Sequence, residues 1–273
     1  MGFLGYKYKR VIVNGCFSGM GEATAKLLVE IGAEVHGLDY KETQLKLASF
    51  TSLDLRDPAS IDTAVARIGG KVDALFNCAG LPHTFPPLDV MKVNYVGTRY
   101  LTERVLPLMS AGSAIASISS TGGLGWSRRI PVLMQLIEIK SYAGIVEWCE
   151  QHPEHVAEGY AFSKEAIIVW TMLTSSSLIK KGIRINCTLP GPTQTPMMAQ
   201  LESASGTAVM EAAMQPINRR SAPDEQAGPL VFLNSDAATY VNGVAFPVDG
   251  GFMGGIATGQ IDLRAMMKNA SPQ

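Results

Sequence analysis

Tyr160 and Lys164 are the pair of residues in this sequence whose types and spacing most clearly allow chemistry. Residues four apart lie about one turn apart on one face of a helix, and the mostly apolar run at 165–170 predicts that this helix continues into a core. An ammonium group beside a phenol favours the phenolate and lowers the pKa of the tyrosine from its ordinary value of about 10. Such a phenol can take a proton from an alcohol or return one to a ketone. A surface Tyr and Lys on one helix is the alternative interpretation of the same spacing.

The N-terminal part of the chain predicts a dinucleotide-binding unit. A strand-like run at 10–14 leads into the glycine-rich loop 15–21, a helical pattern at 22–30 and a second strand-like run that ends at Asp39. Glycines let the backbone approach a pyrophosphate, a helix N-terminus offers it free N–H groups, and an acid about 20 residues on suits a ribose hydroxyl. The spacing is G-x-x-x-G-x-G rather than G-x-G-x-x-G, but strand, helix and acid stand in the required order.

Predicted strands and helices alternate along the rest of the chain. Strand-like runs end near residues 54, 77, 119, 189 and 249, and helical patterns lie at 61–68, 90–109, 160–179 and 224–233. This alternation predicts an α/β fold with a Rossmann-type, doubly wound parallel sheet flanked by helices. Because the sequence shows no internal repeat, low-complexity segment or linker, we expect residues 1–273 to form a single domain.

The composition excludes several classes of function. Hydrophobic residues make up 47% of the 273 residues and charged residues only 17%, which argues against disorder. A net charge of −1 gives no electrostatic basis for binding nucleic acid. The cysteines are scattered, the N-terminus lacks a signal-like apolar run, and no stretch is long enough to span a bilayer. We therefore expect a cytoplasmic protein without a membrane or metal partner, since His152 and His155 have no further ligand cluster nearby.

Several motifs, taken in order, resemble those of the short-chain dehydrogenase/reductase family in its compact single-domain form, and the resemblance covers nearly the whole chain. It rests on the glycine loop, on Asn77-Cys-Ala-Gly80 with Cys for a second Asn, on Asn94, Ser120, Tyr160 and Lys164, on Pro190-Gly191 with Thr195, and on Val248-Asp-Gly-Gly251. In such sheets, ligands bind outside the carboxyl ends of the strands, where all these motifs fall.

The chain departs from the family pattern in two places. Asn14 stands where the family usually has Thr, and 40 residues separate Ser120 from Tyr160. The second departure implies an insertion at about 122–156. A similar insertion occurs in two subgroups that the chain resembles, the bacterial 3α-hydroxysteroid dehydrogenase/carbonyl reductases and the coniferyl-alcohol dehydrogenases.

The resemblance implies a role for each member of a catalytic set. Tyr160 would be the general acid/base, and Lys164 would lower its pKa and contact the nicotinamide ribose. Ser120 would hydrogen-bond the substrate oxygen, chosen over Ser119 by the family's register, although a Ser at a strand end can also serve only the backbone. Asn94 would hold a water in a proton relay to Lys164, whereas a helical Asn is otherwise usually a surface residue.

The resemblance also implies a cofactor site and a choice of cofactor. Asp39 would repel the 2′-phosphate of NADP, and Ser18 stands where NADP-using relatives often carry a basic residue, so we predict NAD although Lys41 is nearby. Asp54 would cap the adenine side or serve only as a turn acid. The predicted cofactor-binding residues are Gly15, Ser18, Gly19, Met20, Gly21, Asp39, Asp54, Leu55, Asn77, Ala79, Gly80, Tyr160, Lys164, Pro190, Gly191, Thr193 and Thr195.

Two segments bear on the substrate. Residues at about 192–220 correspond to the family's lid, and their methionines suit either an apolar ligand or plain packing; these are Met197, Met198, Met210 and Met214. The insertion would wall the pocket or form an oligomer contact through Trp126, Leu133, Met134, Ile137 and Trp148.

Together these features predict an NAD-dependent oxidoreductase that interconverts an apolar alcohol and its ketone or aldehyde by hydride transfer. A hydroxysteroid-type cyclic alcohol is the first expectation and a coniferyl-like aryl alcohol the alternative. A catalytically silent dinucleotide-sensing protein on the same fold is the remote alternative. The resemblance further implies a homodimer or homotetramer, because relatives commonly associate through helices equivalent to 90–109 and 161–179.

Overall fold

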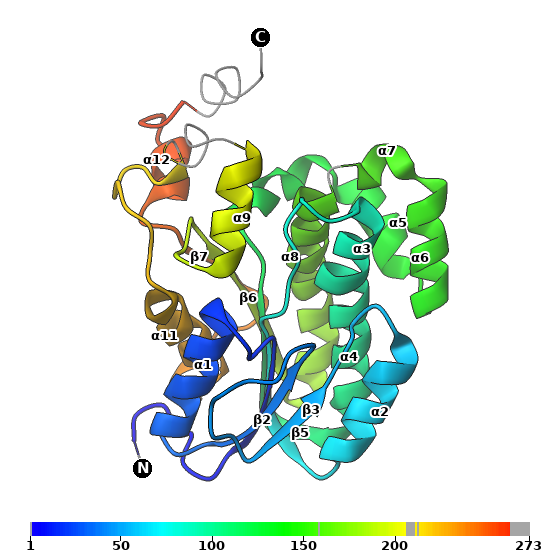
Figure 1. Cartoon of the computed structure of the whole chain (residues 1–273), viewed down its shortest axis with the longest axis vertical. Helices are drawn as coiled ribbons and strands as arrows, with labels where there is room; N and C mark the ends of the chain where they lie inside the picture. The colour runs from blue at the N-terminus through cyan, green and yellow to red at the C-terminus, as the bar shows by residue number, and fades with distance from the viewer. Residues whose placement is uncertain (1, 158, 206–210, 212, 263–273) are drawn as a thin grey trace.

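The computed structural model describes residues 2–157, 159–205, 211 and 213–262. Within them, one fully parallel sheet has the strand order β3-β2-β1-β4-β5-β6-β7, with helices on both faces (Figure 1). The strands are β1 (Arg10–Asn14), β2 (Glu34–Asp39), β3 (Ser49–Ser52), β4 (Val72–Asn77), β5 (Met109–Ile118), β6 (Arg184–Pro190) and β7 (Ala245–Val248). The predicted Rossmann-type, doubly wound fold is confirmed.

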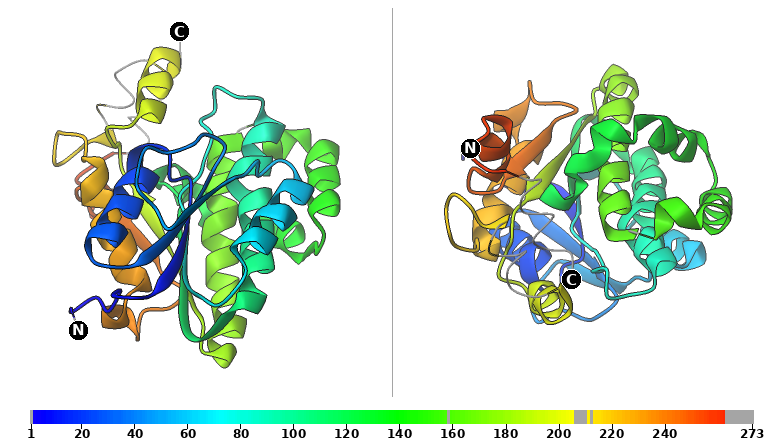
Figure 2. Two further views of the ribbon diagram at one scale, coloured as in Figure 1. Left: turned by 60° about the horizontal axis from the view of Figure 1, so that its bottom comes forward. Right: turned by 90° about the horizontal axis from the view of Figure 1, so that it is seen from above.

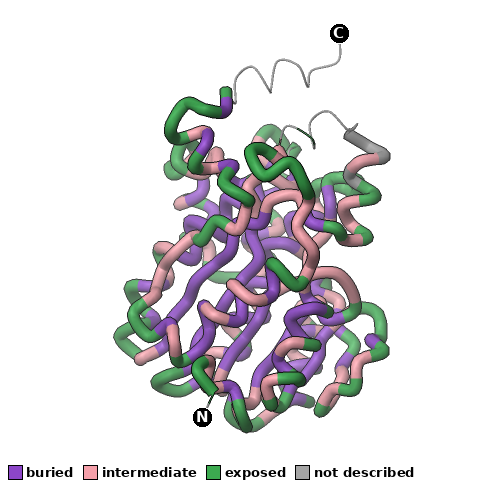
Figure 3. Tube along the Cα trace, turned by 90° about the vertical axis from the view of Figure 1, so that its left-hand side faces the viewer, coloured by how far each residue is buried: buried purple, intermediate pink, exposed green. Residues whose placement is uncertain are grey.

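The inner strands β1, β4, β5 and β6 are largely buried on both faces, because their side chains alternate between two hydrophobic cores. In β1, Ile12 enters one core while Val11 and Val13 enter the other. The first core lies beneath α2 (Pro58–Ile68), α4 (Thr98–Val105) and α8 (Gly159–Leu178), and the second beneath α1 (Gly19–Glu30) and α11 (Pro223–Asn234). Figure 3 shows these strands as the buried centre of the molecule.

The fifth strand begins earlier than its hydrophobic pattern predicts. We expected a helix to Met109 and a strand from Ala114, but α4 ends at Val105, a 3₁₀ turn η2 (Leu106–Leu108) follows, and β5 starts at Met109. A register shift between Val72 and Ala74 of β4 allows the additional residues of β5 to join the sheet.

The insertion forms a separate group of short helices at one side of the sheet. After the 3₁₀ segment η3 (Thr121–Arg128) come α5 (Ile130–Glu138), α6 (Tyr142–Gln151) and α7 (Pro153–Val156), which pack beside α8 and α3 (Pro87–Met91) (Figure 2). Leu133, Ile137 and Trp148 are buried in the core shared with α8, and Trp126 and Met134 pack against it. Neither expected role fits the three buried side chains, because they extend the core and cannot present a surface.

Arg99 of α4 fastens this insertion to the body of the domain. Its guanidinium is buried and donates hydrogen bonds to the carbonyl oxygens of Ile137 (3.0 Å) and Ile139 (2.8 Å) at the end of α5. It also pairs with the Glu103 carboxylate at 2.7 Å. The insertion therefore occupies part of the α4 and α8 face through which relatives were expected to associate.

The described part of the segment expected to form a lid and the segment around α12 lie at the carboxyl edge of the sheet, at the top of Figure 1. They include α9 (Pro196–Ser205) and α12 (Phe252–Ala257). No helix in the described part of the chain combines the length and apolar character needed to cross a bilayer.

Acid is expected to destabilise the fold through His36 of β2. Arg10 Nε donates to His36 Nε2 at 2.9 Å, and burial, reinforced by this cation, lowers the pKa of His36 despite the opposing Glu34 carboxylate. The unfolded chain therefore takes up a proton below its ordinary pKa of about 6.5 while the folded chain resists it, so stability falls with falling pH by up to about 1.4 kcal/mol per pH unit. Urea unfolding can be measured at several values between about pH 7.5 and about pH 5, a range that brackets the ordinary pKa of histidine. The loss of stability over this range should be smaller in His36→Gln than in the wild-type chain. Equal falls in both proteins would contradict this assignment.

Candidate active site

The four predicted catalytic residues converge at the carboxyl edge of the sheet. Ser120 follows β5, Tyr160 and Lys164 lie in the first turns of α8, and Asn94 lies in the π-helical turn η1 (Lys92–Gly97). A Cβ placed on Gly122 would lie 3.4 Å from both Ser120 Oγ and Tyr160 Cε1. On Gly80 it would lie 3.4 Å from Asn94 Oδ1 and 3.7 Å from Lys164 Nζ.

Tyr160 does not have the lowered pKa that its spacing from Lys164 predicts. Burial raises the pKa of Tyr160, and its hydrogen bond with Ser120 is the contact that opposes this rise. Lys164 Nζ lies 5.6 Å from the centre of the tyrosine ring and donates a hydrogen bond to Ile118 O at 3.0 Å. The predicted direction is therefore wrong for this structure, because burial raises the pKa of Tyr160 and Lys164 is not among the groups that oppose it.

Lys164 is itself buried, with 5% of its surface exposed. Burial lowers its pKa to about 8, because desolvation disfavours the charged form. Ser119 Oγ donates to Lys164 O at 2.8 Å, which occupies Ser119 with the α8 backbone. Ser120 is thus the member of the serine pair that faces Tyr160.

Asn94 joins the loop after β4 to α8. Its Oδ1 accepts from Leu81 N at 2.7 Å, and its Nδ2 donates to Leu81 O at 3.0 Å and to Ser163 Oγ at 3.2 Å. Ser163 in turn donates to Tyr160 O at 2.7 Å. The amide hydrogens of Asn94 are used by these partners, and its part in a water relay stays a prediction.

The glycine loop forms a cradle that side chains would fill. A Cβ on Gly15 (φ +88°) would lie 2.4 Å from Ala79 N, and one on Gly21 would lie 1.9 Å from Gly15 O. Within the described chain, no side-chain hydrogen bond caps α1 at Ser18, and Met20 lies in the first turn. A helix N-terminus of this kind, reached by bare backbone, fits the pyrophosphate of a dinucleotide.

Asp39 lies beside this cradle at the end of β2. Its Oδ2 accepts from Phe17 N at 2.9 Å and its Oδ1 from Lys41 N at 3.0 Å. Lys41 Nζ lies 5.5 Å from the centre of the Phe17 ring. Backbone donors therefore fix the carboxylate where the loop would place a ribose.

Three further predicted cofactor residues have their side chains engaged elsewhere. Asp54 forms an ion pair with Arg56 at 2.8 Å, and hydrogen bonding from Arg56 lowers the pKa of Asp54. The Leu55 side chain is buried. Asn77 is buried and its Nδ2 donates to Thr102 Oγ1 (3.0 Å) and Ser117 Oγ (3.2 Å). The Nδ2 group of Asn77 is therefore engaged, whereas its buried Oδ1 makes no hydrogen bond within the described chain.

The segment after β6 reaches back to the glycine loop. Thr195 Cγ2 would lie 3.1 Å from a Cβ on Gly19, while a Cβ on Gly191 would approach the backbone of Asp249. Thr193 Oγ1 donates to Gly191 O at 2.9 Å. The P-G-x-x-x-T segment, which begins at Pro190, thus approaches the cradle at Gly19.

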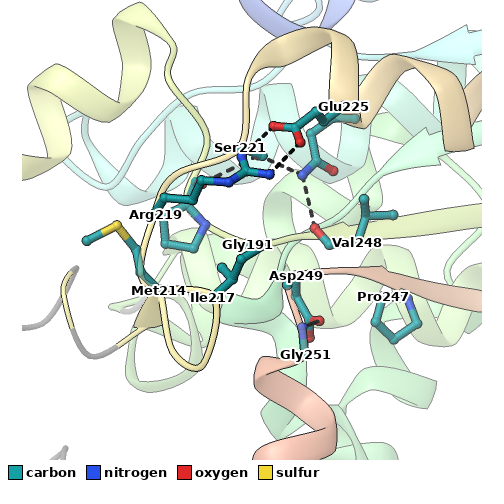
Figure 4. A pocket seen from close by; sticks show the side chains of 13 residues that line it. Gly191, Met214, Ile217, Arg219, Ser221, Glu225, Pro247, Val248, Asp249 and Gly251 are labelled. Carbon is teal, nitrogen blue, oxygen red and sulfur yellow. Dashed lines mark hydrogen bonds and ion pairs between the residues drawn. The ribbon is translucent and has the colours of Figure 1, made fainter.

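The lid methionines separate into different surroundings. Met197 Cε would lie 3.7 Å from a Cβ on Gly80, beside Lys164, and Met198 follows it in α9. Met214 lines a cavity of about 340 Å³ behind Gly191 (Figure 4). Met210 lies outside the described residues. Only Met197 is therefore placed by a contact beside the catalytic set.

His152 and His155 stack on Trp148, with ring centres 4.2 and 6.0 Å away. Across residues 2–157, 159–205, 211 and 213–262, no group of three or more His, Cys, Asp or Glu side chains could hold a metal ion.

Sequence reasoning did not single out Ser163, Arg129 or Glu165. Glu165 had a recognisable signal, since a charged residue heads the otherwise apolar run 166–170 directly after Lys164. Arg129 and Ser163 had no such signal, because both stand among polar and apolar residues that follow no clear pattern.

Two family models and several known dehydrogenases are similar to this chain in sequence. The family model described as short chain dehydrogenase matches residues 9–131, and the model described as enoyl-(acyl carrier protein) reductase matches residues 134–253. The chain is 34% identical over 244 residues to the coniferyl-alcohol dehydrogenase of Pseudomonas sp. (strain HR199), covering 89% of this chain and 96% of that one. It is 30% identical over 248 residues to the 3-alpha-hydroxysteroid dehydrogenase/carbonyl reductase of Comamonas testosteroni, covering 88% and 95%.

A solved structure with a similar fold has a related name. The crystal structure of the 3-alpha-hydroxysteroid dehydrogenase from Pseudomonas sp. B-0831 complexed with NADH matches with a TM-score of 0.78 at 27% identity, covering 92% of this chain and 99% of that one. From the matched motifs, the shared fold and these relatives, the chain belongs to the short-chain dehydrogenase/reductase family of oxidoreductases.

Proposed function

We propose that this protein is an NAD-dependent oxidoreductase that interconverts an apolar alcohol and its ketone or aldehyde. The observation that carries the proposal is the convergence of Ser120, Tyr160 and Lys164 next to the glycine cradle. Bound NAD would supply the hydride acceptor, chemistry that belongs to the cofactor. The cradle and the Asp39 carboxylate would hold the dinucleotide.

The residues of the chain would manage the proton. The Ser120 hydroxyl, which lies beside Tyr160, would orient the substrate oxygen and stabilise developing charge on it. Tyr160 would take the alcohol proton as general base and return it in the reverse direction. Lys164, whose Nζ donates to Ile118 O, would contact the nicotinamide ribose.

Two classes of apolar alcohol have specific support. The 34% identity to a coniferyl-alcohol dehydrogenase favours an aryl alcohol, and the relatives named for 3-alpha-hydroxysteroids favour a cyclic alcohol. The test is NADH formation with a panel of aryl, steroid and terpenoid alcohols, each offered with NAD and with NADP. Turnover of one class with NAD supports the proposal. Tight NADH binding without any turnover would favour the dinucleotide-sensing alternative.

The choice of NAD predicts the effect of Asp39→Asn. This change keeps the shape of the side chain but removes the charge that should bind the ribose hydroxyls, so we expect NADH to bind about tenfold more weakly. NADPH should bind more tightly because the repulsion is gone. Fluorescence titration of both cofactors measures the ratio, with Glu42→Gln, an exposed neighbouring acid, as the matched control. An unchanged NADH to NADPH ratio would contradict the assignment of Asp39.

The insertion bears on assembly. Because α5 is fastened to α4 by Arg99 and packs beside α8, a second copy could not lie flat on both helices. We propose that any homodimer or homotetramer forms through another face. Light scattering of the wild-type chain and crosslinking mapped by mass spectrometry would test this.

A further inference from the structure

Glu165 is a carboxylate buried in α8, one residue beyond Lys164. Only 3% of its surface is exposed, and burying a charge costs free energy unless a partner compensates it. Its Oε2 lies 3.6 Å from Nη1 of Arg129, whose side chain is 35% exposed. Arg129 directly follows η3, so this ion pair joins α8 to the first segment of the insertion.

The backbone of η3 lies directly against α8 at the same point. A Cβ on Gly125 would lie 2.4 Å from Glu165 Oε1. A Cβ on Gly123 would lie 3.0 Å from Lys164 C and 3.1 Å from Glu165 N. Glycine at both positions lets η3 approach the helix that carries the catalytic pair, and the Glu165 carboxylate fills the space beside Gly125.

The segment η3, which the Glu165–Arg129 ion pair joins to α8, is preceded directly by Ser120. Ser120 caps η3, since its Oγ accepts from Gly122 N at 3.0 Å. A Cβ on Gly122 would lie 3.4 Å from both this Oγ and Tyr160 Cε1, which places the hydroxyl beside the phenol ring. The position of the Ser120 hydroxyl is therefore set by η3, and the position of the phenol by α8. Whatever fixes η3 on α8 also fixes the distance between these two groups.

We propose that Glu165 and Arg129 are positioning residues whose ion pair holds η3 against α8 and thereby keeps the Ser120 hydroxyl in hydrogen-bonding range of Tyr160. Neither side chain is in the catalytic set, and both act through η3. The kinetic part of this inference rests on the proposed oxidoreductase function, whereas its structural part does not.

Loss of the ion pair has an expected kinetic signature. Misplacement of a catalytic group by about 1 Å can lower a rate about 100-fold, so we expect Glu165→Gln and Arg129→Gln to lower kcat about 10- to 100-fold. NADH affinity should stay within about twofold, because the glycine cradle is built on the turn between β1 and α1 and not on η3. In alcohol oxidation, where Tyr160 acts as the base, the acidic limb of the pH profile should move to higher pH, because hydrogen bonding by Ser120 opposes the rise in the pKa of Tyr160.

The experiment compares Glu165→Gln, Arg129→Gln and the double variant in a double-mutant cycle. Because the buried position of Glu165 could impair folding, Arg129→Gln removes the same ion pair from its more exposed end. Glu103→Gln is the matched control, since it removes the carboxylate partner of Arg99, the other arginine that fastens the insertion. If the pair acts as a unit, the double variant should lose no more activity than either single variant, and the control should keep the wild-type kcat and pH profile.

A second readout separates this inference from the proposed function. Hydrogen exchange of residues 121–128, and the Ser120 to Tyr160 distance in crystal structures of the variants, require no turnover. Faster exchange and a longer distance in Glu165→Gln and Arg129→Gln support positioning even if no tested alcohol is oxidised. Variants that fold, keep wild-type exchange in 121–128 and show an unchanged kcat and pH profile would overturn it, as would an equal loss in Glu103→Gln.

Discussion

Tyr160→Phe is expected to lower kcat by at least about 1000-fold while NADH still binds. General acid–base catalysis contributes about 100- to 10,000-fold, and phenylalanine keeps the ring while removing the hydroxyl that we propose exchanges a proton with the alcohol. The glycine cradle and Asp39 lie on other elements and should be unaffected. Steady-state rates with the best alcohol of the panel, together with NADH fluorescence titration, measure both quantities.

The matched control for this change is Tyr100→Phe. The Tyr100 hydroxyl interacts with the Asp62 carboxylate at 3.2 Å on the outer side of α4, so its removal should leave kcat within about twofold. If Tyr160→Phe lost NADH binding together with activity, the tyrosine would be a structural or cofactor-binding residue. That result would contradict its proposed role in proton transfer.

Arg99→Met should produce the largest loss of stability, about 3–5 kcal/mol in the free energy of unfolding. Methionine fills similar space but leaves the carbonyl oxygens of Ile137 and Ile139 without their donor and Glu103 without its cation. Unpaired buried polar groups carry their full desolvation penalty. Urea unfolding followed by circular dichroism measures the change.

Arg104→Met is the natural comparison, because Arg104 and Asp62 form an ion pair whose side chains are 52% and 43% exposed. Removing an exposed pair should change stability by no more than about 1 kcal/mol. A loss of the same small size in Arg99→Met would mean that the insertion is held by apolar packing alone.

Much of the fold could be read from the sequence because strand and helix periods are local signals. The apolar runs of β1 and β4 were predicted within their observed bounds, since each is short, buried on both faces and followed by a polar turn. The start of β5 was not predictable, because Met109 joins the sheet only through the irregular pairing of Val72 with it. Such pairing depends on two segments that are distant in sequence.

The candidate site shows the same division. The convergence of Ser120, Tyr160 and Lys164 follows from the rule that strand ends of a parallel sheet meet at one edge. The direction of the Tyr160 pKa did not follow, because burial is a property of the assembled fold and not of the Tyr-Lys spacing. The ion pair of Glu165 with Arg129 was equally inaccessible, since 36 residues of sequence separate its partners.

The bridge between Thr195 and Gly19 has a consequence for the order of events in turnover. Thr195 contacts the cradle and Met197 lies beside Gly80, so one stretch of chain reaches both the proposed cofactor site and the loop next to the proposed catalytic residues. Substrate bound beneath that stretch would block the exit of the cofactor. We therefore expect compulsory-order kinetics, with the dinucleotide first to arrive and last to leave, and a turnover rate governed by how quickly residues 193–197 lift away.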